Sequence, residues 1–344
     1  MFPVDKFTLP FIRFIDRNFI INEHLFIINS IINVEFLNNI NVVIVEKDNF
    51  RKKNYFNYSK KIREYCKNAN KIIYHSLHGD NKFLFLFFNQ YLLKKTFWVI
   101  WGADLYDYQK MDNSISDKIK FYIKKQVIKK MGHFITYIKG DYELVQKWYG
   151  ANGKYHECFM YPSNLYKEYD VKEKSSGTIN IQVGNSADPS NNHLEVLDKL
   201  TKYKNENIKI FVPLSYGDEK YASEIIAKGK EIFGDSFIAL TEFMPFDKYL
   251  DFLGDIDIAI FAHKRQQAMG NTITLLGLGK KVYMRNDVTP WKLFSDIDIK
   301  VFDVENIDID VIMEETKVDN KRKIKEYFSE ENYLKQLQNL FESK

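Results

Sequence analysis

Short apolar runs alternate with longer amphipathic stretches along the second half of the chain. The pattern predicts strands at 178–183, 208–212, 237–240, 256–261 and 281–284, and helices near 193–203, 219–233, 246–253 and 269–278. Apolar runs of this length, rich in β-branched residues and bounded by turn formers, are typical of buried strands. Strands that alternate with helices in this way favour βαβ units, so we predict an α/β fold with a parallel sheet.

The first half follows a less regular pattern, and its start predicts no clear element. Strands are expected at 25–28, 42–45, 71–77, 96–101 and 133–138, with a helix-like stretch before residue 42 and helices at 81–95, at 116–131 and from about Asp141. The polar stretch 161–177 has turn formers at both ends and predicts a connection between domains. We therefore expect domains at 1–163 and 164–320. The charged helix at 321–344 could cross back to the first domain.

Composition narrows the class of protein. A net charge of +4, with 45% hydrophobic and 28% charged residues, excludes a disordered chain and argues against a dedicated nucleic-acid binder. Two cysteines, Cys66 and Cys158, are too few for a disulfide framework or a thiolate metal site. No apolar run reaches the ~18 residues of a membrane span, and the N-terminus does not resemble a signal peptide. These features predict a cytoplasmic protein that touches a membrane without crossing it.

Two loops of the second half have the composition of anion sites. The loop 184–192 joins a strand to a helix, and its small residues allow a phosphate to approach backbone amides at a helix start. The loop 263–272 adds a fixed cation before another helix. The alternatives are a well-capped turn and solvated loop charges. The candidate donor-binding residues are Gly184, Asn185, Ser186, Asn192, Arg265, Gln266, Gln267, Gly270, Asn271 and Thr272.

Proton-transfer candidates follow two strands of the first half. His78 and Asp104 stand directly after predicted strands, where a parallel sheet carries its ligands. A lone residue of either type is more often a cap, but two at adjacent strand ends favour catalysis. The Asp-x-Asp pairs at 255–257 and 308–310 border strand-like apolar residues, so we assign no metal.

A membrane surface is predicted by two segments. Six lysines (Lys118, Lys120, Lys124, Lys125, Lys129 and Lys130) accompany an apolar stripe of Ile119, Tyr122, Ile123 and Val127. The run 83–88 is apolar on more than one face. An anionic leaflet would attract the first segment and accept the second. The alternatives are an ordinary amphipathic helix and a buried core helix.

Motifs in order along the chain resemble one known family. They are His78-Gly79, Ile100 to Tyr106 (Ile-Trp-Gly-Ala-Asp-Leu-Tyr), Val183 to Ser186, Ser190-Asn191, His193, Val212-Pro213 with Tyr216, Phe246-Asp247, Tyr249-Leu250, Ala262, Arg265 to Gln267, Asn286 and Pro290-Trp291. This set is similar to the bacterial 4-acetamido-4,6-dideoxygalactose (Fuc4NAc) transferases of enterobacterial common antigen synthesis. The similarity spans roughly residues 70–295.

The resemblance implies a GT-B glycosyltransferase, with two Rossmann-like domains facing across a cleft, a dTDP-sugar donor held by the second domain and an undecaprenyl-diphosphate-linked acceptor at the inner leaflet. It implies no metal and no cofactor. Tyr216 joins the donor site, Asp104 is the preferred base with His78 as the alternative, and Trp101 and Tyr106 form a wall against the sugar. The rival interpretations are a nucleotide-sugar epimerase or hydrolase and a non-catalytic saccharide-binding protein.

Overall fold

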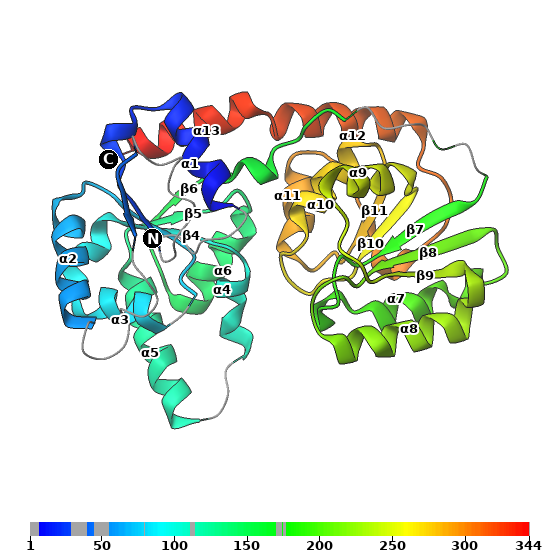
Figure 1. Cartoon of the computed structure of the whole chain (residues 1–344), viewed down its shortest axis with the longest axis horizontal. Helices are drawn as coiled ribbons and strands as arrows, with labels where there is room; N and C mark the ends of the chain where they lie inside the picture. Colours follow the sequence, from blue (N-terminus) through cyan, green and yellow to red (C-terminus); the bar gives the residue numbers. More distant parts are fainter. Residues whose placement is uncertain are drawn as a thin grey trace. The chain divides into compact units, whose positions relative to one another are not determined.

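The computed structural model describes residues 7–28, 40–44, 55–78, 80–110, 114–169, 174 and 177–343 (Figure 1). The chain divides into two compact units. Unit 1 comprises Met1–Ser163 and Tyr333–Lys344, and unit 2 comprises Asn164–Asn332.

Unit 2 is a parallel sheet with helices on both faces. Its strands are β7 (Ile179–Val183), β8 (Ile208–Pro213), β9 (Phe237–Leu240), β10 (Ile258–Phe261), β11 (Lys281–Met284) and β12 (Phe302–Asp303). Its helices are α7 (His193–Leu200), α8 (Glu219–Phe233), α9 (Phe246–Asp255), α10 (Met269–Gly277), α11 (Thr289–Asp296) and α12 (Glu314–Tyr327). Within the described residues the strand order is β12-β11-β10-β7-β8-β9, all parallel. The predicted α/β class is confirmed here.

The strand β7 lies where the direction of winding reverses. After β7 the chain adds β8 on one side and later β10 on the other. Ile181 and Val183 join the apolar core, whereas the intervening Gln182 points to the opposite face and is also fully buried. Ligands of open α/β sheets bind beyond the carboxyl ends of such a switch point. The loops after β7 and β10 therefore form the expected binding edge.

Unit 1 has a four-stranded parallel sheet and a separate two-stranded one in its described part. Its strands are β1 (Phe26–Ile28), β2 (Val42–Ile44), β3 (Ile72–His75), β4 (Thr96–Val99), β5 (His133–Ile135) and β6 (Lys154–His156), ordered β1-β2 and β3-β4-β5-β6. Its helices are α1 (Thr8–Asn18), α2 (Tyr55–Asn68), α3 (Asp80–Phe88), α4 (Ala103–Tyr106), α5 (Ile115–Lys130), α6 (Lys139–Tyr149) and α13 (Glu330–Glu342).

Short 3-10 segments complete the chain. They are η1 (Ile21–Glu23), η4 (Gln90–Lys95), η5 (Asp107–Lys110), η6 (Pro162–Asn164), η7 (Pro189–Asn191), η8 (Thr201–Tyr203), η9 (Gly234–Ser236) and η10 (Val304–Asn306).

Several expected boundaries are wrong for local reasons. The helix expected at 81–95 divides into α3 and η4 at Asn89, whose side chain donates to the carbonyl of Phe85 at 2.7 Å and competes with the helical backbone. The charged tail divides into α12 and α13. The sequence pattern missed α1, α2, β6, α11 and β12. The helix-like stretch expected before residue 42 lies outside the described residues.

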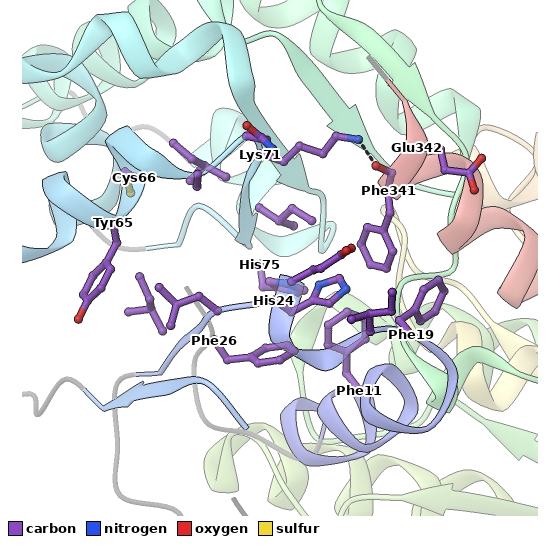
Figure 2. A pocket seen from close by; sticks show the side chains of 18 of the residues that line it. Phe11, Phe19, His24, Phe26, Tyr65, Cys66, Lys71, His75, Phe341 and Glu342 are labelled. Atoms are coloured by element: carbon purple, nitrogen blue, oxygen red, sulfur yellow. Dashed lines mark hydrogen bonds between the residues drawn. The ribbon is translucent and has the colours of Figure 1, made fainter. Parts of the chain in front are cut away.

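A lysine binds the C-terminal end of α13 to the sheet region of unit 1. The ammonium of Lys71, just before β3, donates to the carbonyls of Phe341 at 2.5 Å and Leu340 at 2.9 Å, and to the hydroxyl of Ser343 at 3.3 Å (Figure 2). A cation satisfies the free carbonyls at a helix C-terminus and complements its dipole. Burial lowers the pKa of Lys71, with Lys154 adding to the effect.

We expect Lys71→Met to lower the free energy of unfolding of the full chain by about 1–2 kcal/mol, because the last carbonyls of α13 lose a charged donor. Urea denaturation measures the change. The control is Lys60→Met at an exposed position of α2, which should change stability by less than about 0.5 kcal/mol. Equal losses in the two variants would contradict the capping role.

A cavity of about 1270 Å³ lies beside this cap, bordered by β1 on one side and β3 on the other (Figure 2). Its described lining mixes apolar and polar side chains and includes the aromatic residues Phe11, Phe19, Phe26 and Phe341. The lining includes neither His78 nor Asp104. The cavity is therefore separate from the proton-transfer candidates.

Candidate active site

One buried amide joins the two switch-point loops of unit 2. The oxygen of Asn191 accepts from the backbone N–H of Asn185 at 2.9 Å, and Nε2 of His263 lies 2.8 Å from the same oxygen. The Asn191 nitrogen donates to the carbonyl of Asp188 at 2.9 Å and to the hydroxyl of Ser186 at 3.3 Å. Asn191 therefore hydrogen-bonds residues of both loops and holds the loop after β7 against the loop after β10.

Gly184 must be glycine in this arrangement. Its φ is +67°, and a Cβ there would lie 2.3 Å from Nε2 of His193 and 2.8 Å from the Asn191 oxygen. His193 is the first residue of α7, and its Nδ1 pairs with the hydroxyl of Tyr221 at 3.2 Å. Close packing of the Gly184 backbone against these side chains sets the course of the loop.

The polar side chains of the second loop turn toward the first loop. Gln267 accepts from the hydroxyl of Ser190 at 2.8 Å, and its nitrogen lies 3.5 Å from the Asn185 oxygen. The Asn185 nitrogen donates to the hydroxyl of Tyr216 at 3.1 Å. The structure therefore brings together Asn185, Gln267 and Tyr216, which the sequence analysis proposed from separate motifs.

Arg265 supplies a partly buried cation at this edge. Its guanidinium donates to the carbonyl of Gln266 at 3.2 Å and, among the described residues, forms no pair with a carboxylate. Gly270 and Asn271 lie half-buried in the first turn of α10, directly after this loop. A guanidinium without an acidic partner next to a helix N-terminus favours an anionic ligand.

Two of the residues proposed to bind the sugar donor use their side chains for hydrogen bonds to backbone carbonyls of the protein. The hydroxyl of Thr272 donates to the carbonyl of Ala268 at 3.1 Å, and the side chain is buried. The amide of Asn192 donates to the carbonyls of Ser190 at 2.9 Å and Ala262 at 2.8 Å. The Asn192 amide joins the two loops and the Thr272 hydroxyl bonds within the start of α10, so the structure gives these two donors partners inside the protein.

A set of buried polar residues lies under the site and was not expected from the sequence pattern. Tyr249 of α9 hydrogen-bonds Gln182 and Asn271, and burial raises the pKa of its hydroxyl, which keeps it neutral. Within the described chain, buried polar atoms without a partner include Gln182 Oε1, His193 Nε2 and Gln266 Oε1, all at this edge. Such atoms are costly unless a ligand or water meets them. A glutamine inside the apolar strand 178–183 was the available signal.

Burial lowers the pKa of both histidines of the site. His193 falls to about 4, and His263 falls to about 3 with the Arg265 charge adding to the effect. Both rings are therefore neutral in the folded protein at pH 7, and each keeps the tautomer that its neighbours require.

Stability should fall as the pH drops from 6.5 toward 4. The unfolded chain, with histidine pKa values near 6.5, binds more protons over this range than the folded one. Urea midpoints measured at pH 7.5, 6 and 5 should decline steadily. His263→Gln keeps a donor for Asn191 but cannot titrate, so its decline should be shallower by an amount on the order of 1 kcal/mol. Parallel declines would contradict this account.

Asp104 in unit 1 is a structural anchor. Its side chain is fully buried, and its carboxylate accepts from the backbone N–H groups of Leu77 at 2.8 Å and Trp101 at 3.0 Å and from the indole of Trp98 at 2.8 Å. Lys124 donates to the Asp104 carbonyl at 2.7 Å. The preference for Asp104 as the base is corrected, because its oxygens face protein donors and not solvent.

His78 is the accessible proton-transfer candidate. Its side chain is 66% exposed, and its Nδ1 lies 3.3 Å from Oδ2 of Asp107, which follows α4. A carboxylate on one ring nitrogen orients a histidine and leaves the other nitrogen, Nε2, for a substrate. The strand ends of β3 and β4 bring His78 and Asp107 together, and no sequence motif predicted this pair.

The two residues of the expected sugar wall lie in different environments. Trp101 is partly exposed, and its indole donates to the hydroxyl of Tyr161 at 2.8 Å. Tyr106 is buried in the core of unit 1, edge-on to Trp148. The expectation for Tyr106 is corrected, because α4 turns its ring inward.

One aspartate of each Asp-x-Asp pair forms an ion pair with a lysine. Asp257 pairs with Lys174 and accepts from the backbone N–H of Asn180 at 2.8 Å, and Asp308 pairs with Lys281. In the part of the chain that the structure describes, no group of three or more His, Cys, Asp or Glu residues has the geometry of a metal site.

Comparison with known proteins decides the class of enzyme. The family described as "4-alpha-L-fucosyltransferase glycosyl transferase group 56" matches residues 28–343. The chain belongs to this family. The predicted resemblance is confirmed, and the protein is a glycosyltransferase of the Fuc4NAc transferase family.

Solved structures place this group 56 glycosyltransferase in the GT-B fold, as predicted. A glycosyltransferase from Rickettsia africae ESF-5 is 16% identical with a TM-score of 0.66, covering 99% of this chain and 96% of that one. Anabaena Alr3699/HepE, in complex with UDP and glucose, is 9% identical with a TM-score of 0.68 and coverages of 98% and 95%. WaaG, involved in lipopolysaccharide biosynthesis, is 9% identical with a TM-score of 0.61 and coverages of 100% and 99%.

The group 56 chain carries no helix, among the residues described, that combines the length and apolar character needed to cross a membrane.

Proposed function

We propose that this glycosyltransferase transfers a Fuc4NAc-like deoxyamino sugar from a dTDP-activated donor to a hydroxyl of an undecaprenyl-diphosphate-linked saccharide. The observation that carries the donor half is the switch-point edge of unit 2. There, Arg265, which has no acidic partner among the described residues, comes just before the start of α10, at an edge that also holds unsatisfied buried polar atoms.

The reaction replaces the nucleotide on the anomeric carbon of the donor with the acceptor oxygen. The acceptor oxygen forms a bond to that carbon, and the bond to the nucleotide phosphate breaks. The electron pair leaves with the pyrophosphate, whose growing charge is stabilised by Arg265 and by backbone N–H groups at the start of α10. The hydroxyl proton passes to Nε2 of His78, and Asp107 stabilises the imidazolium that results.

The acceptor half of the proposal is supported by the exposed face of α5. Ile115, Ile119 and Tyr122 are exposed at helical spacing, with Lys118 and Lys129 on the same face. We call these five residues the α5 face. This combination of apolar and basic side chains suits the surface of an anionic leaflet. Asp107 stands eight residues before Ile115 along the chain, and a lipid-linked acceptor is proposed to reach the base from this face.

The α5 face differs from the predicted lysine stripe. Lys124 and Val127 are buried, and the run 83–88 is mostly core, with only Phe88 strongly exposed. The core-helix alternative is therefore right for that run, whereas the membrane proposal now depends on the α5 face.

Replacing Ile115 and Ile119 together with glutamate should lower binding to vesicles containing phosphatidylglycerol about tenfold or more, because burial of two apolar side chains is lost and like charges are introduced. Cosedimentation measures binding, and wild-type binding should weaken as salt rises. Val318→Glu, at an exposed apolar position of α12, is the matched control and should bind like wild type. Wild-type behaviour of the double variant would contradict the assignment of this face.

A transfer assay tests the function. The full chain is incubated with labelled dTDP-Fuc4NAc, with and without a lipid-linked saccharide in vesicles, and we expect labelled lipid only when both substrates are present. Donor consumption at the same rate without acceptor would instead indicate an epimerase or hydrolase. Saccharide binding without donor consumption would indicate a binding protein.

A further inference from the structure

Two aromatic side chains stand exposed at neighbouring strand ends of unit 2. Tyr216 follows β8 and is 56% exposed, and Phe243 follows β9 and is 82% exposed. The strands β8 and β9 pair in parallel, and their carboxyl ends are joined by the bond from Leu214 N–H to the Leu240 carbonyl at 2.8 Å. Large exposed aromatic residues next to a ligand site are typical of contact surfaces and not of cores.

Tyr216 is held in register with the Gly184 loop. The backbone N–H of Ala187 donates to the Tyr216 carbonyl at 2.8 Å, and the N–H of Asp218 donates back to the Ala187 carbonyl at 2.9 Å. Between them, Gly217 has φ +124°, and a Cβ there would lie 2.6 Å from the Ala187 carbonyl carbon. The close approach of these two loops therefore depends on glycine, which indicates that backbone contacts fix the position of Tyr216.

The spacing of the strands lets the far end of a nucleotide reach the loop that carries Phe243. Neighbouring strands lie about 4.8 Å apart, so β9 lies about 10 Å from β7. A pyrophosphate held beyond β7 and β10 would direct its ribose past Tyr216 and its base toward the loop after β9. The opposite direction leads to β11, whose following residue, Arg285, is paired with Glu195 at 3.2 Å and Asp287 at 3.1 Å.

We propose that Phe243 stacks on the nucleobase of the donor and that Tyr216 flanks the ribose. This inference rests on the proposed function, because it extends the same donor site. Every nucleobase offers a flat π face, so stacking supplies affinity and orientation without choosing among bases. Phe243 is therefore a positioning residue, and it should contribute equally to the binding of thymidine and uridine diphosphates.

Calorimetry with three probes tests the proposal on the full chain. Phe243→Ala should weaken binding of thymidine diphosphate and of uridine diphosphate about tenfold or more and leave the affinity for inorganic pyrophosphate unchanged. Phe243→Trp should restore nucleotide affinity, and its fluorescence should be quenched by either nucleotide but not by pyrophosphate. Val318→Ala, at another exposed apolar position of unit 2, should leave all three affinities unchanged.

Two results would overturn the stacking role. One is nucleotide affinity in Phe243→Ala within twofold of wild type. The other is a tryptophan signal that responds equally to pyrophosphate and nucleotide. Either outcome leaves the proposed function standing if wild-type chain still binds nucleotide, whereas absence of binding by both nucleotide and pyrophosphate to wild type would count against the donor site itself.

Discussion

Replacing His78 with alanine is expected to lower the rate of sugar transfer about 10²–10⁴-fold, the usual contribution of a general base. Thymidine diphosphate affinity should not change, because the ring belongs to unit 1 and the donor loops to unit 2. Asp107→Asn should lower the rate less, since it removes the carboxylate 3.3 Å from Nδ1 but leaves the imidazole in place. Initial rates at saturating donor and acceptor, with calorimetric binding in parallel, measure both effects.

Asp104→Asn separates the two base assignments. The variant replaces a buried acceptor of three N–H groups with an amide, so we expect a loss of stability of about 2 kcal/mol or more. The part that remains folded should still transfer sugar. If instead Asp104→Asn folds normally without activity and His78→Ala remains active, Asp104 is the base and the correction drawn from its burial is wrong.

Replacing Arg265 with alanine is expected to lower the transfer rate about 10²–10³-fold and to weaken thymidine diphosphate binding, because the charge that meets the departing pyrophosphate is removed. Lys264 is the matched control. It is the adjacent cation and is exposed, whereas Arg265 is partly buried. Lys264→Ala should therefore change nucleotide affinity by no more than about threefold.

The decisive quantity is the thymidine diphosphate affinity of Arg265→Ala relative to that of Lys264→Ala. Equal losses in Lys264→Ala and Arg265→Ala would indicate a diffuse charge effect, which should also disappear at high salt. A normal rate in Arg265→Ala would remove the guanidinium from the mechanism. Thermal unfolding of both variants confirms that the site remains folded.

The sequence could predict the sheet of unit 2 because its elements are patterned locally. Apolar β-strands such as 208–213 and the helix after Asp218 carry their own periodicity, boundaries and caps. Unit 1 was harder, because α1 and α2 depend on contacts with distant segments. Phe14 of α1, for example, packs against Tyr333 of α13, and no local pattern announces such a contact.

In the site, too, local features were predictable from the sequence and distant contacts were not. Loop motifs located Asn185, Arg265 and Gln267, because small and polar residues between a strand and a helix are visible in sequence. Their partners were not visible. His263 reaches Asn191 and Tyr249 reaches Gln182 only after the sheet and α9 have formed.

The role of Asp104 could not be inferred from its position in the sequence. The place after a buried strand suits a catalytic carboxylate and equally suits an anchor for backbone N–H groups. Only the three donors around it distinguish the two roles.

The central claim is that the switch-point loops of unit 2 hold the donor pyrophosphate, and a crystal of the full chain soaked with thymidine diphosphate tests it most directly. We predict phosphate density within hydrogen-bonding distance of Arg265 and the first turn of α10, beside the Gly184 loop. Phosphate density at any other place, or none at a nucleotide concentration that saturates binding in solution, would contradict the account.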